Sequence, residues 1–375
     1  MDSMTKRSIG SFRRRILLGA MVLLAGAIAY PQTSAAKGEP KKPKGALYVA
    51  NGTNVLAFNL DHFKKGTHNV KPDLTLSSAT GFGNVQGVVF DAALKNLWVI
   101  DGGNTSVGGT AAPAVEKFPY SVFFKLKHKK FPPLPKIRIF FSGFVFPQQA
   151  AFDAPGNLWV SDSGANAIYG FNPAQLAAGG AQTPLSITSS SLFPFRIPRG
   201  MAFDSSGNLL VANSGDDSIF KFNASTLPSP ATTTGVVALT PNVILSDNGA
   251  NSIQAPWGLG LDGAGSLWSS NANPPSTVVK FAKTDLGVTG SPDPAVKLSP
   301  TTDSMGNTTL TAPNGIAFDN LGNLVVINSA TPFSIAYFST GQLTTGGALV
   351  PNTLLVGNNT TLNAPAGCTV GPSVK

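Results

Sequence analysis

The feature that most constrains the fold of this chain is a short pattern that occurs five times. Each copy is an apolar strand ending in Asp, a short turn that contains Gly in four of the five copies, and a second apolar strand. The copies read GVVFDAALKNLWVID from Gly87, QAAFDAPGNLWVSD from Gln149, GMAFDSSGNLLVAN from Gly200, GLGLDGAGSLWSSN from Gly258 and GIAFDNLGNLVVIN from Gly315. Their shared aspartates lie 51 to 62 residues apart (Asp91, Asp153, Asp204, Asp262, Asp319). A repeat of this length, with short strands and tight turns, is typical of a β-propeller blade.

The two ends of the chain supply the parts of a sixth blade. ALYVANGTNVLAFN from Ala46 matches the second and third strands of a repeat, with no first strand before it. LNAPAGCTV from Leu362 matches a first strand with nothing after it. The sequence therefore predicts an all-β, six-bladed propeller whose ring is closed by one blade shared between the N- and C-terminal strands. Closure of this kind removes the unpaired sheet edges of an open ring.

The repeated lines resemble the NHL-repeat family of six-bladed propellers and the related senescence-marker-protein and gluconolactonase-like propellers. The pattern FD..GNLWV.DS.....I..F carries the resemblance and is clearest at 152–171 and 203–222. The similarity covers about residues 46 to 371. It implies the fold more strongly than the activity, because propellers of this kind include lyases, lactonases and binding proteins.

The N-terminal segment is typical of a protein that is exported. Basic residues up to Arg15 precede the apolar run 16–30, and small residues follow as far as Ala36. We therefore expect a secretory signal peptide at 1–36, of Sec or twin-arginine type, and a secreted or periplasmic protein. A basic Pro/Lys-rich linker at 37–45, the propeller at 46–371 with an insertion at 119–136, and a tail at 372–375 complete the expected organisation.

The net charge of +9 does not indicate nucleic-acid binding. Five basic residues and one acid belong to the signal segment, so the remaining chain carries +5. Residues 37–44 contribute +3 of this and the insertion contributes +5, which leaves the rest of the propeller at −3. The insertion places aromatic residues beside a cluster of lysines (Lys125, Lys127, Lys129, Lys130). This segment is either a patch for an anionic polymer or a membrane surface, or a solvated hairpin whose Phe residues cover the blade edge.

The candidate ligand site lies where the repeats differ from one another. In a propeller the first strands line the central channel, and the middle residue of a triplet that reads Pro-x-Gly in four of the six repeats should lie at one mouth of that channel. This position varies around the ring (Gln86, Gln148, Arg199, Trp257, Asn314, Ala366). The first five of these residues could stack on and hydrogen-bond a small polar ligand or a protein partner, the alternative being channel filling by side chains and water. The residues that end the second strands are nearly uniform Asp or Asn, so we expect them to be structural.

The same positions argue against a metal-dependent enzyme. The resemblance to gluconolactonase-like propellers implies acidic and amide metal ligands, but only Asn314 fits that pattern, and Arg199 would repel a cation. We therefore predict no catalytic residues, no metal ligands and no cofactor, with calcium disfavoured. The histidines (His62, His68, His128) are expected in connecting loops or the insertion. The predicted function is that of an exported, monomeric binding or scaffold propeller. The alternatives are a lactonase or hydrolase, and adhesion through the insertion.

Overall fold

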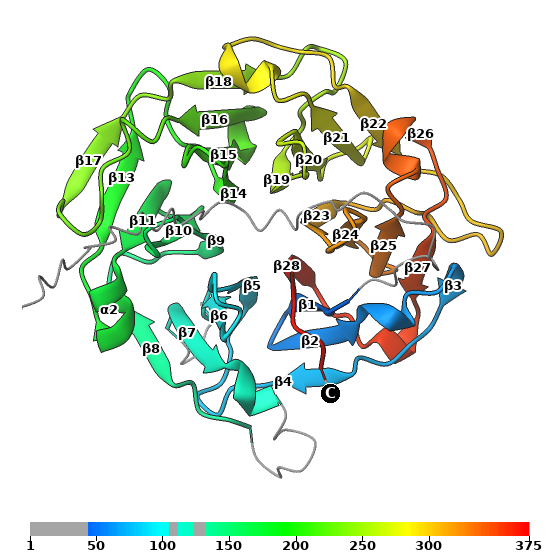
Figure 1. Ribbon diagram of the computed structural model, residues 1–375, viewed down its shortest axis with the longest axis horizontal. Helices are drawn as coiled ribbons and strands as arrows, with labels where there is room; N and C mark the ends of the chain where they lie inside the picture. Colours follow the sequence, from blue (N-terminus) through cyan, green and yellow to red (C-terminus); the bar gives the residue numbers. More distant parts are fainter. Residues whose placement is uncertain (1–43, 105–111, 124–131, 375) are drawn as a thin grey trace, which may run out of the picture.

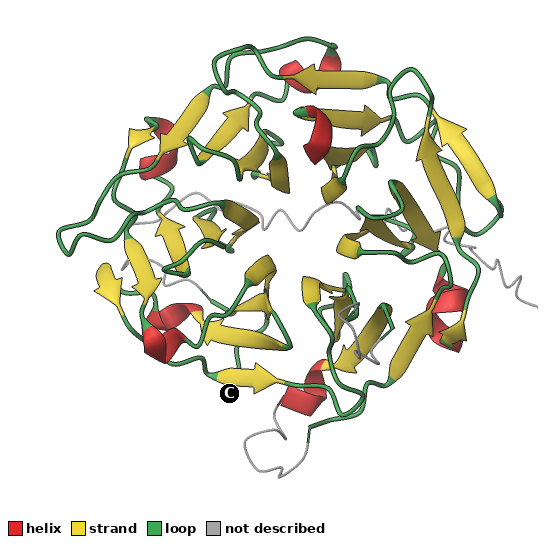
Figure 2. Cartoon of the chain, turned by 180° about the vertical axis from the view of Figure 1, so that it is seen from behind, coloured by secondary structure: helices red, strands yellow, loops and turns green. Residues whose placement is uncertain are grey.

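The fold was analysed in a computed structural model that describes residues 44–104, 112–123 and 132–374. Six small, mainly antiparallel sheets stand in a ring (Figures 1 and 2). Blade 1 is the sheet that contains the N-terminal strand, and blades 2 to 6 follow it in chain order. The predicted six-bladed propeller is confirmed. Among the described residues, no helix is long and apolar enough to cross a membrane.

Each blade contains four strands in the order expected from the repeat. The first strands line the channel and are β28 (Pro365–Gly371), β5 (Val85–Phe90), β9 (Pro147–Phe152), β14 (Pro198–Phe203), β19 (Pro256–Leu261) and β23 (Pro313–Phe318). The second strands are β1 (Ala46–Asn51), β6 (Asn96–Asp101), β10 (Leu158–Asp162), β15 (Leu209–Asn213), β20 (Leu267–Asn271) and β24 (Leu324–Asn328). The third strands are β2 (Asn54–Asn59), β7 (Ala114–Pro119), β11 (Ala167–Phe171), β16 (Ser218–Phe222), β21 (Thr277–Phe281) and β25 (Ser334–Phe338). The fourth strands are β4 (Leu74–Leu76), β8 (Ile137–Phe140), β13 (Leu185–Ser189), β18 (Val243–Ser246), β22 (Val296–Ser299) and β27 (Thr353–Val356).

The ring is closed in blade 1, where the two chain ends meet. Strand β28 pairs antiparallel with β1, with Val49 opposite Cys368 and Tyr48 opposite Thr369. Figure 1 shows this blade as the place where blue and red strands lie side by side. Hydrogen bonds from the Tyr48 hydroxyl to Pro372 O and from Val374 N to Asn59 Oδ1 continue the closure beyond the strands. The sharing of one blade between the termini is as predicted.

Four blades carry a fifth strand that the sequence did not reveal. The connection between the third and fourth strands of one blade adds a short parallel strand to the outer edge of the preceding blade. These strands are β3 (Gly66–His68) on blade 6, β12 (Gly180–Ala181) on blade 2, β17 (Val236–Leu239) on blade 3 and β26 (Gly347–Ala348) on blade 5. Glycine pairs supply the positive φ angles for two of them, with φ of 66° and 70° at Gly179 and Gly180 and of 67° and 95° at Gly346 and Gly347.

Short helices occur only in the connections between strands of the described chain. The α-helix α2 (Pro173–Ala178) begins with a capping box in which Asn172 and Gln175 exchange hydrogen bonds. The remaining helices are 3₁₀ turns, namely η1 (Leu60–His62), η2 (Tyr120–Val122), η3 (Ser214–Asp216), η4 (Asp285–Gly287), η5 (Gln342–Thr344) and η6 (Asn358–Thr360). Two expectations were wrong here. His68 lies in β3 rather than in a loop, and Pro119 is the last residue of β7 rather than part of the insertion.

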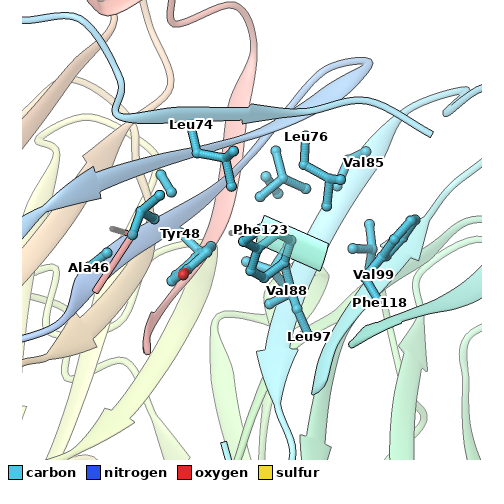
Figure 3. Close-up of a cluster of buried hydrophobic side chains, with 14 of the residues drawn as sticks. Ala46, Tyr48, Leu74, Leu76, Val85, Val88, Leu97, Val99, Phe118 and Phe123 are labelled. Carbon is cyan, nitrogen blue, oxygen red and sulfur yellow. The ribbon is translucent and has the colours of Figure 1, made fainter. Parts of the chain in front are cut away.

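The hydrophobic core is divided into six clusters, one between each pair of neighbouring blades. Figure 3 shows the cluster between blades 1 and 2, where Tyr48 and Leu74 face Val88 and Phe118. The Trp of the second strand packs on the first strand of the next blade, with Trp98 against Phe152, Trp159 against Phe203 and Trp268 against Phe318 at ring distances of 6.0 to 6.2 Å.

Neighbouring first strands approach so closely that glycine occupies the last position of the triplet that reads Pro-x-Gly in most repeats, in five of the six blades. A Cβ atom at Gly258 would lie 2.3 Å from the carbonyl oxygen of Asn314, and one at Gly200 would lie 2.2 Å from that of Trp257. Real Cβ atoms do not come this near to a backbone oxygen. The repeated glycine therefore allows the backbones of adjacent blades to touch.

The substitution Gly258→Ala should consequently reduce the free energy of unfolding by about 1–3 kcal/mol, because the added methyl group overpacks the contact between blades 5 and 6. Chemical denaturation would measure the loss. Gly263→Ala is the matched control, since a Cβ there meets nothing within 4 Å. A loss of similar size in both variants would show that close approach is not what requires the glycine.

Candidate functional site

The varied Pro-x-Gly residues lie on the first strands, which surround the channel in Figure 1. They occupy the second position of their strands and follow one another around the ring: Gln86, Gln148, Arg199, Trp257, Asn314 and Ala366 in blades 2, 3, 4, 5, 6 and 1. The strand pairing shifts register at or next to this position in every blade, so a bulge marks the site. The bulges are a consequence of the same triplet that brings the backbones together.

Arg199 and Trp257 form the centre of this group. The guanidinium carbon of Arg199 lies 3.4 Å from the centroid of the Trp257 ring, so the planar cation stacks on the indole. Burial lowers the pKa of Arg199 to about 10, which still leaves the group charged at neutral pH. No carboxylate of the described residues forms an ion pair with it. A partly buried cation, with its Nε and Nη1 atoms covered, is thus held against an aromatic ring without a counter-charge.

Polar atoms on four consecutive blades are buried and have no hydrogen-bond partner among the described residues. They are Gln148 Oε1, Arg199 Nε and Nη1, Trp257 Nε1 and Asn314 Oδ1. Gln148 is 1% exposed and Asn314 is 5% exposed. Because an unpaired buried polar group costs about 1–3 kcal/mol, a cluster of five such atoms indicates a place built to be paired by another molecule.

Gln86 belongs to the ring of residues but not to the unpaired set. Its side chain lies beside Gly102, where a Cβ atom would approach Gln86 Cγ to 3.3 Å. Ala366, in blade 1, contributes no polar atom. The polar side of the mouth therefore runs through blades 3 to 6, with blades 1 and 2 contributing less.

Sequence reasoning missed Gln149, which takes the place of the triplet glycine in blade 3. Its Nε2 donates to Gln86 O at 2.8 Å, and its side chain also reaches Gly367 in blade 1, two blades away. The side chain therefore crosses one sector of the channel just below the varied residues. The sequence does contain a sign of this role, because Gln149 stands where the other repeats have Gly.

The Asp and Asn residues that end the second strands hold the mouth in shape. Asp162 accepts hydrogen bonds from the backbone N–H groups of Val145, Phe146, Gly164 and Ala165 at 2.8 to 3.0 Å. Asn328 accepts from Thr311 N and donates to Thr309 O and Ser334 Oγ. Asn51, Asp101, Asn213 and Asn271 bind the corresponding loops in the same way. These side chains join each second strand to the loop before its own first strand, which agrees with a structural role.

Several apolar side chains are exposed on the loops over blades 3 and 4, next to the exposed ion pair of Arg196 with Asp216. Val145, Leu192, Phe193 and Ile197 lie on the loops that precede β9 and β14 and are 40–80% exposed. The turn at 164–166 contacts both loops. Val145 lies against Gly164, and Ile197 N donates a hydrogen bond to Asn166 Oδ1. The unpaired polar atoms therefore have an exposed apolar border beside Arg199.

The other candidate residues lie apart from the mouth or outside the described residues. Lys125, Lys127, Lys129 and Lys130 lie outside them, as do His128 and the expected signal peptide. Phe123 of the insertion is 1% exposed and contacts Tyr48 and Tyr120 (Figure 3), so this aromatic residue covers the blade edge and is not available to a partner. No group of three His, Cys, Asp or Glu side chains suited to a metal ion occurs in the described part of the chain.

Comparisons with known proteins identify the fold only. By sequence, no known family profile and no curated protein matches the chain. A crystal structure of a nidogen/laminin complex is similar at 15% identity with a TM-score of 0.53, covering 88% of this chain and 99% of that chain. A protein of unknown function from Bacteroides caccae is similar at 10% identity with a TM-score of 0.52 and the same coverage. A putative 6-phosphogluconolactonase from Bacteroides fragilis is similar at 13% identity with a TM-score of 0.49, covering 88% and 99%. The first two likenesses support a β-propeller.

The missing counter-charge of Arg199 leads to a stability prediction. Arg199→Met keeps the length of the side chain and removes its charge. It should leave the free energy of unfolding unchanged or raise it by about 1 kcal/mol, because the desolvation cost of an unpaired charge is removed. Arg138→Met is the contrasting variant. Arg138 Nε lies 2.9 Å from Glu116 Oε1, and burial already raises the pKa of the Glu116 carboxyl.

Loss of Arg138 should therefore cost about 2–4 kcal/mol at pH 7 by leaving Glu116 buried without its cation. Thermal and chemical denaturation of both variants would measure the difference. An equally large loss in Arg199→Met would mean that the Arg199–Trp257 stack stabilises the fold and is not maintained for binding.

Proposed function

We propose that the protein is an exported, non-catalytic propeller that binds a small polar ligand at its channel mouth. The observation that carries the proposal is the set of buried, unpaired polar atoms on blades 3 to 6, around the Arg199–Trp257 stack. Such atoms lower stability, and a bound ligand that pairs them would recover the loss. Arg199, Trp257, Gln148 and Asn314 would contact the ligand, and Gln86 and Gln149 would border it.

The absence of a catalytic constellation in the described residues supports a binding role over a hydrolytic one. Asp101 and Asp162 end the second strands that pair with the first strands of blades 2 and 3. Both side chains are fully buried, and their carboxylates already accept hydrogen bonds from backbone N–H groups. His62 and His68 lie in the outer connection of blade 1, near Asp73 and Lys64 respectively. No described side chain at the mouth is thus free to act as a general base.

Two further parts of the proposal rest on the sequence. Kinship with the NHL type is supported by the repeated lines at 152–171 and 203–222, together with the shared fold. Export is supported by the basic, apolar and small-residue segments within 1–36. Mass spectrometry of the protein recovered outside the cytoplasm would test this part, with loss of about the first 36 residues expected.

Ligand binding can be tested with a thermal-shift panel of monosaccharides, disaccharides, amino acids and hydroxy acids on the chain lacking residues 1–36. Compounds that raise the melting temperature would then be measured by calorimetry. The double variant Arg199→Ala/Trp257→Ala should weaken their binding more than about 100-fold and keep the folded state, because charged hydrogen bonds and the stack are lost together.

The matched control is Lys117→Ala, since Lys117 also lies over a Trp, 5.0 Å from the Trp98 ring centroid, but in the third strand of blade 2 and away from the mouth. The Lys117→Ala variant should bind the same compounds with the affinity of the unmodified chain. Unchanged affinity in the Arg199/Trp257 double variant would place the binding site elsewhere.

A further inference from the structure

We infer that the mouth ligand is a small monocarboxylate that also carries hydroxyl or ammonium groups, such as a hydroxy acid or a sugar acid. This inference rests on the proposed function and specifies the chemistry of that same site. It follows from the types of the unpaired atoms of Arg199, Gln148 and Asn314, from the charge at the mouth and from the orientation that the stack gives to Arg199.

Arg199 requires an anion. A guanidinium has two edges that can hold a carboxylate through paired N–H groups, one that includes Nε and one that includes Nη1. Both Nε and Nη1 are buried and lack a partner in the described chain. The positive charge is equally unbalanced, since none of the ion pairs in the described residues involves Arg199. An anionic group in the plane of the guanidinium would satisfy the charge and the donors together.

Trp257 determines how that anion approaches. With the guanidinium carbon 3.4 Å from the ring centroid, the indole covers one face of the cation and leaves its edges for the ligand. A planar carboxylate matches an edge of a planar guanidinium, and this geometry distinguishes Arg from Lys in recognition. Because Arg199 is the one charged residue among the varied mouth positions, a singly charged carboxylate fits better than a phosphate dianion.

The flanking amides require hydrogen-bond donors on the ligand. The orientation of the Gln148 amide follows from a chain of bonds, because Nε2 donates to Ser163 Oγ at 3.1 Å while that hydroxyl donates to Phe146 O. Its Oε1 is therefore the free atom, and it can only accept. Asn314 Oδ1, on the far side of the stack, is the second free acceptor. A hydroxyl or ammonium group on the ligand would pair each of them.

The experiment compares acids with neutral analogues of the same shape. Calorimetry on the chain lacking residues 1–36 would use glycerate against glycerol, D-glucuronate against D-glucose, and propionate as an acid without donors. The hydroxylated acids should bind about 10- to 100-fold more tightly than their neutral analogues and than propionate, as expected for hydrogen bonds to a charged group. Inorganic phosphate should bind more weakly than glycerate.

Variants of Arg199 test whether its charge and its planar shape select acids. Arg199→Met should abolish the preference for acids, and Arg199→Lys should reduce it about tenfold or more because a point charge replaces a planar fork. Lys117→Met should change nothing. Since burial lowers the pKa of Arg199 to about 10, the preference should persist from pH 6 to 9 and decline as the pH rises through 10.

The possible results distinguish this inference from the proposed function. Neutral sugars that bind as tightly as their acids, with loss of binding in the Arg199/Trp257 double variant, would overturn the carboxylate class and leave the mouth as the binding site. Tighter binding of phosphate than of glycerate would also overturn the class. Failure of every compound in both panels to bind at the mouth would count against the inference and the proposed function alike.

Discussion

The structure depends on the close contact between the backbones of neighbouring first strands. Five of the six strands place a glycine where a Cβ atom would lie 2.2 to 2.8 Å from the carbonyl oxygen of the varied residue on the next blade, as Gly200 does with Trp257 O. Ser161 and Ser270 strengthen the contact by donating to Arg199 O and Asn314 O, each across a blade boundary at 2.6 Å. The narrow ring that results sets the distance between opposite walls of the channel.

The same contact explains why chemistry concentrates at the mouth. The glycine fixes the triplet backbone against the next blade, and the bulge fixes its pairing within its own blade. The middle side chain can therefore vary without a change in the strand pairing. The Asp and Asn clamps at the ends of the second strands then hold the incoming loops with backbone hydrogen bonds, as Asp162 does with four N–H groups. Asymmetry among the blades is thus concentrated in one layer of side chains, where six similar units present five different residue types.

The sequence predicted the blades because their signals are local. The FD turn and the alternating strands repeat with little change, so β16 at Ser218–Phe222 and the closure of β28 on β1 could be located in advance. The parallel strands β12 and β26 could not, because two residues have no periodicity and their partners belong to another blade. Arg199 and Trp257 were identified as mouth residues from their place in the triplet, but their stacking and the reach of Gln149 depend on three-dimensional distances that no spacing reveals.

The Arg199–Trp257 pair shows how a stable scaffold can accommodate an unfavourable group. A guanidinium that is buried without a carboxylate has a desolvation cost that stacking on an indole offsets only in part. Elsewhere in the ring, buried charge is compensated: Glu116 receives Arg138 together with hydrogen bonds from Ser78 and Thr80, and Asp319 receives Asn323 and Tyr337. Arg199 differs from these groups, because no described carboxylate pairs with it and the polar atoms beside it on Gln148, Trp257 and Asn314 also lack partners. The six apolar clusters between the blades supply the stability that allows this exception, and the exception lies at the one layer where the repeats differ.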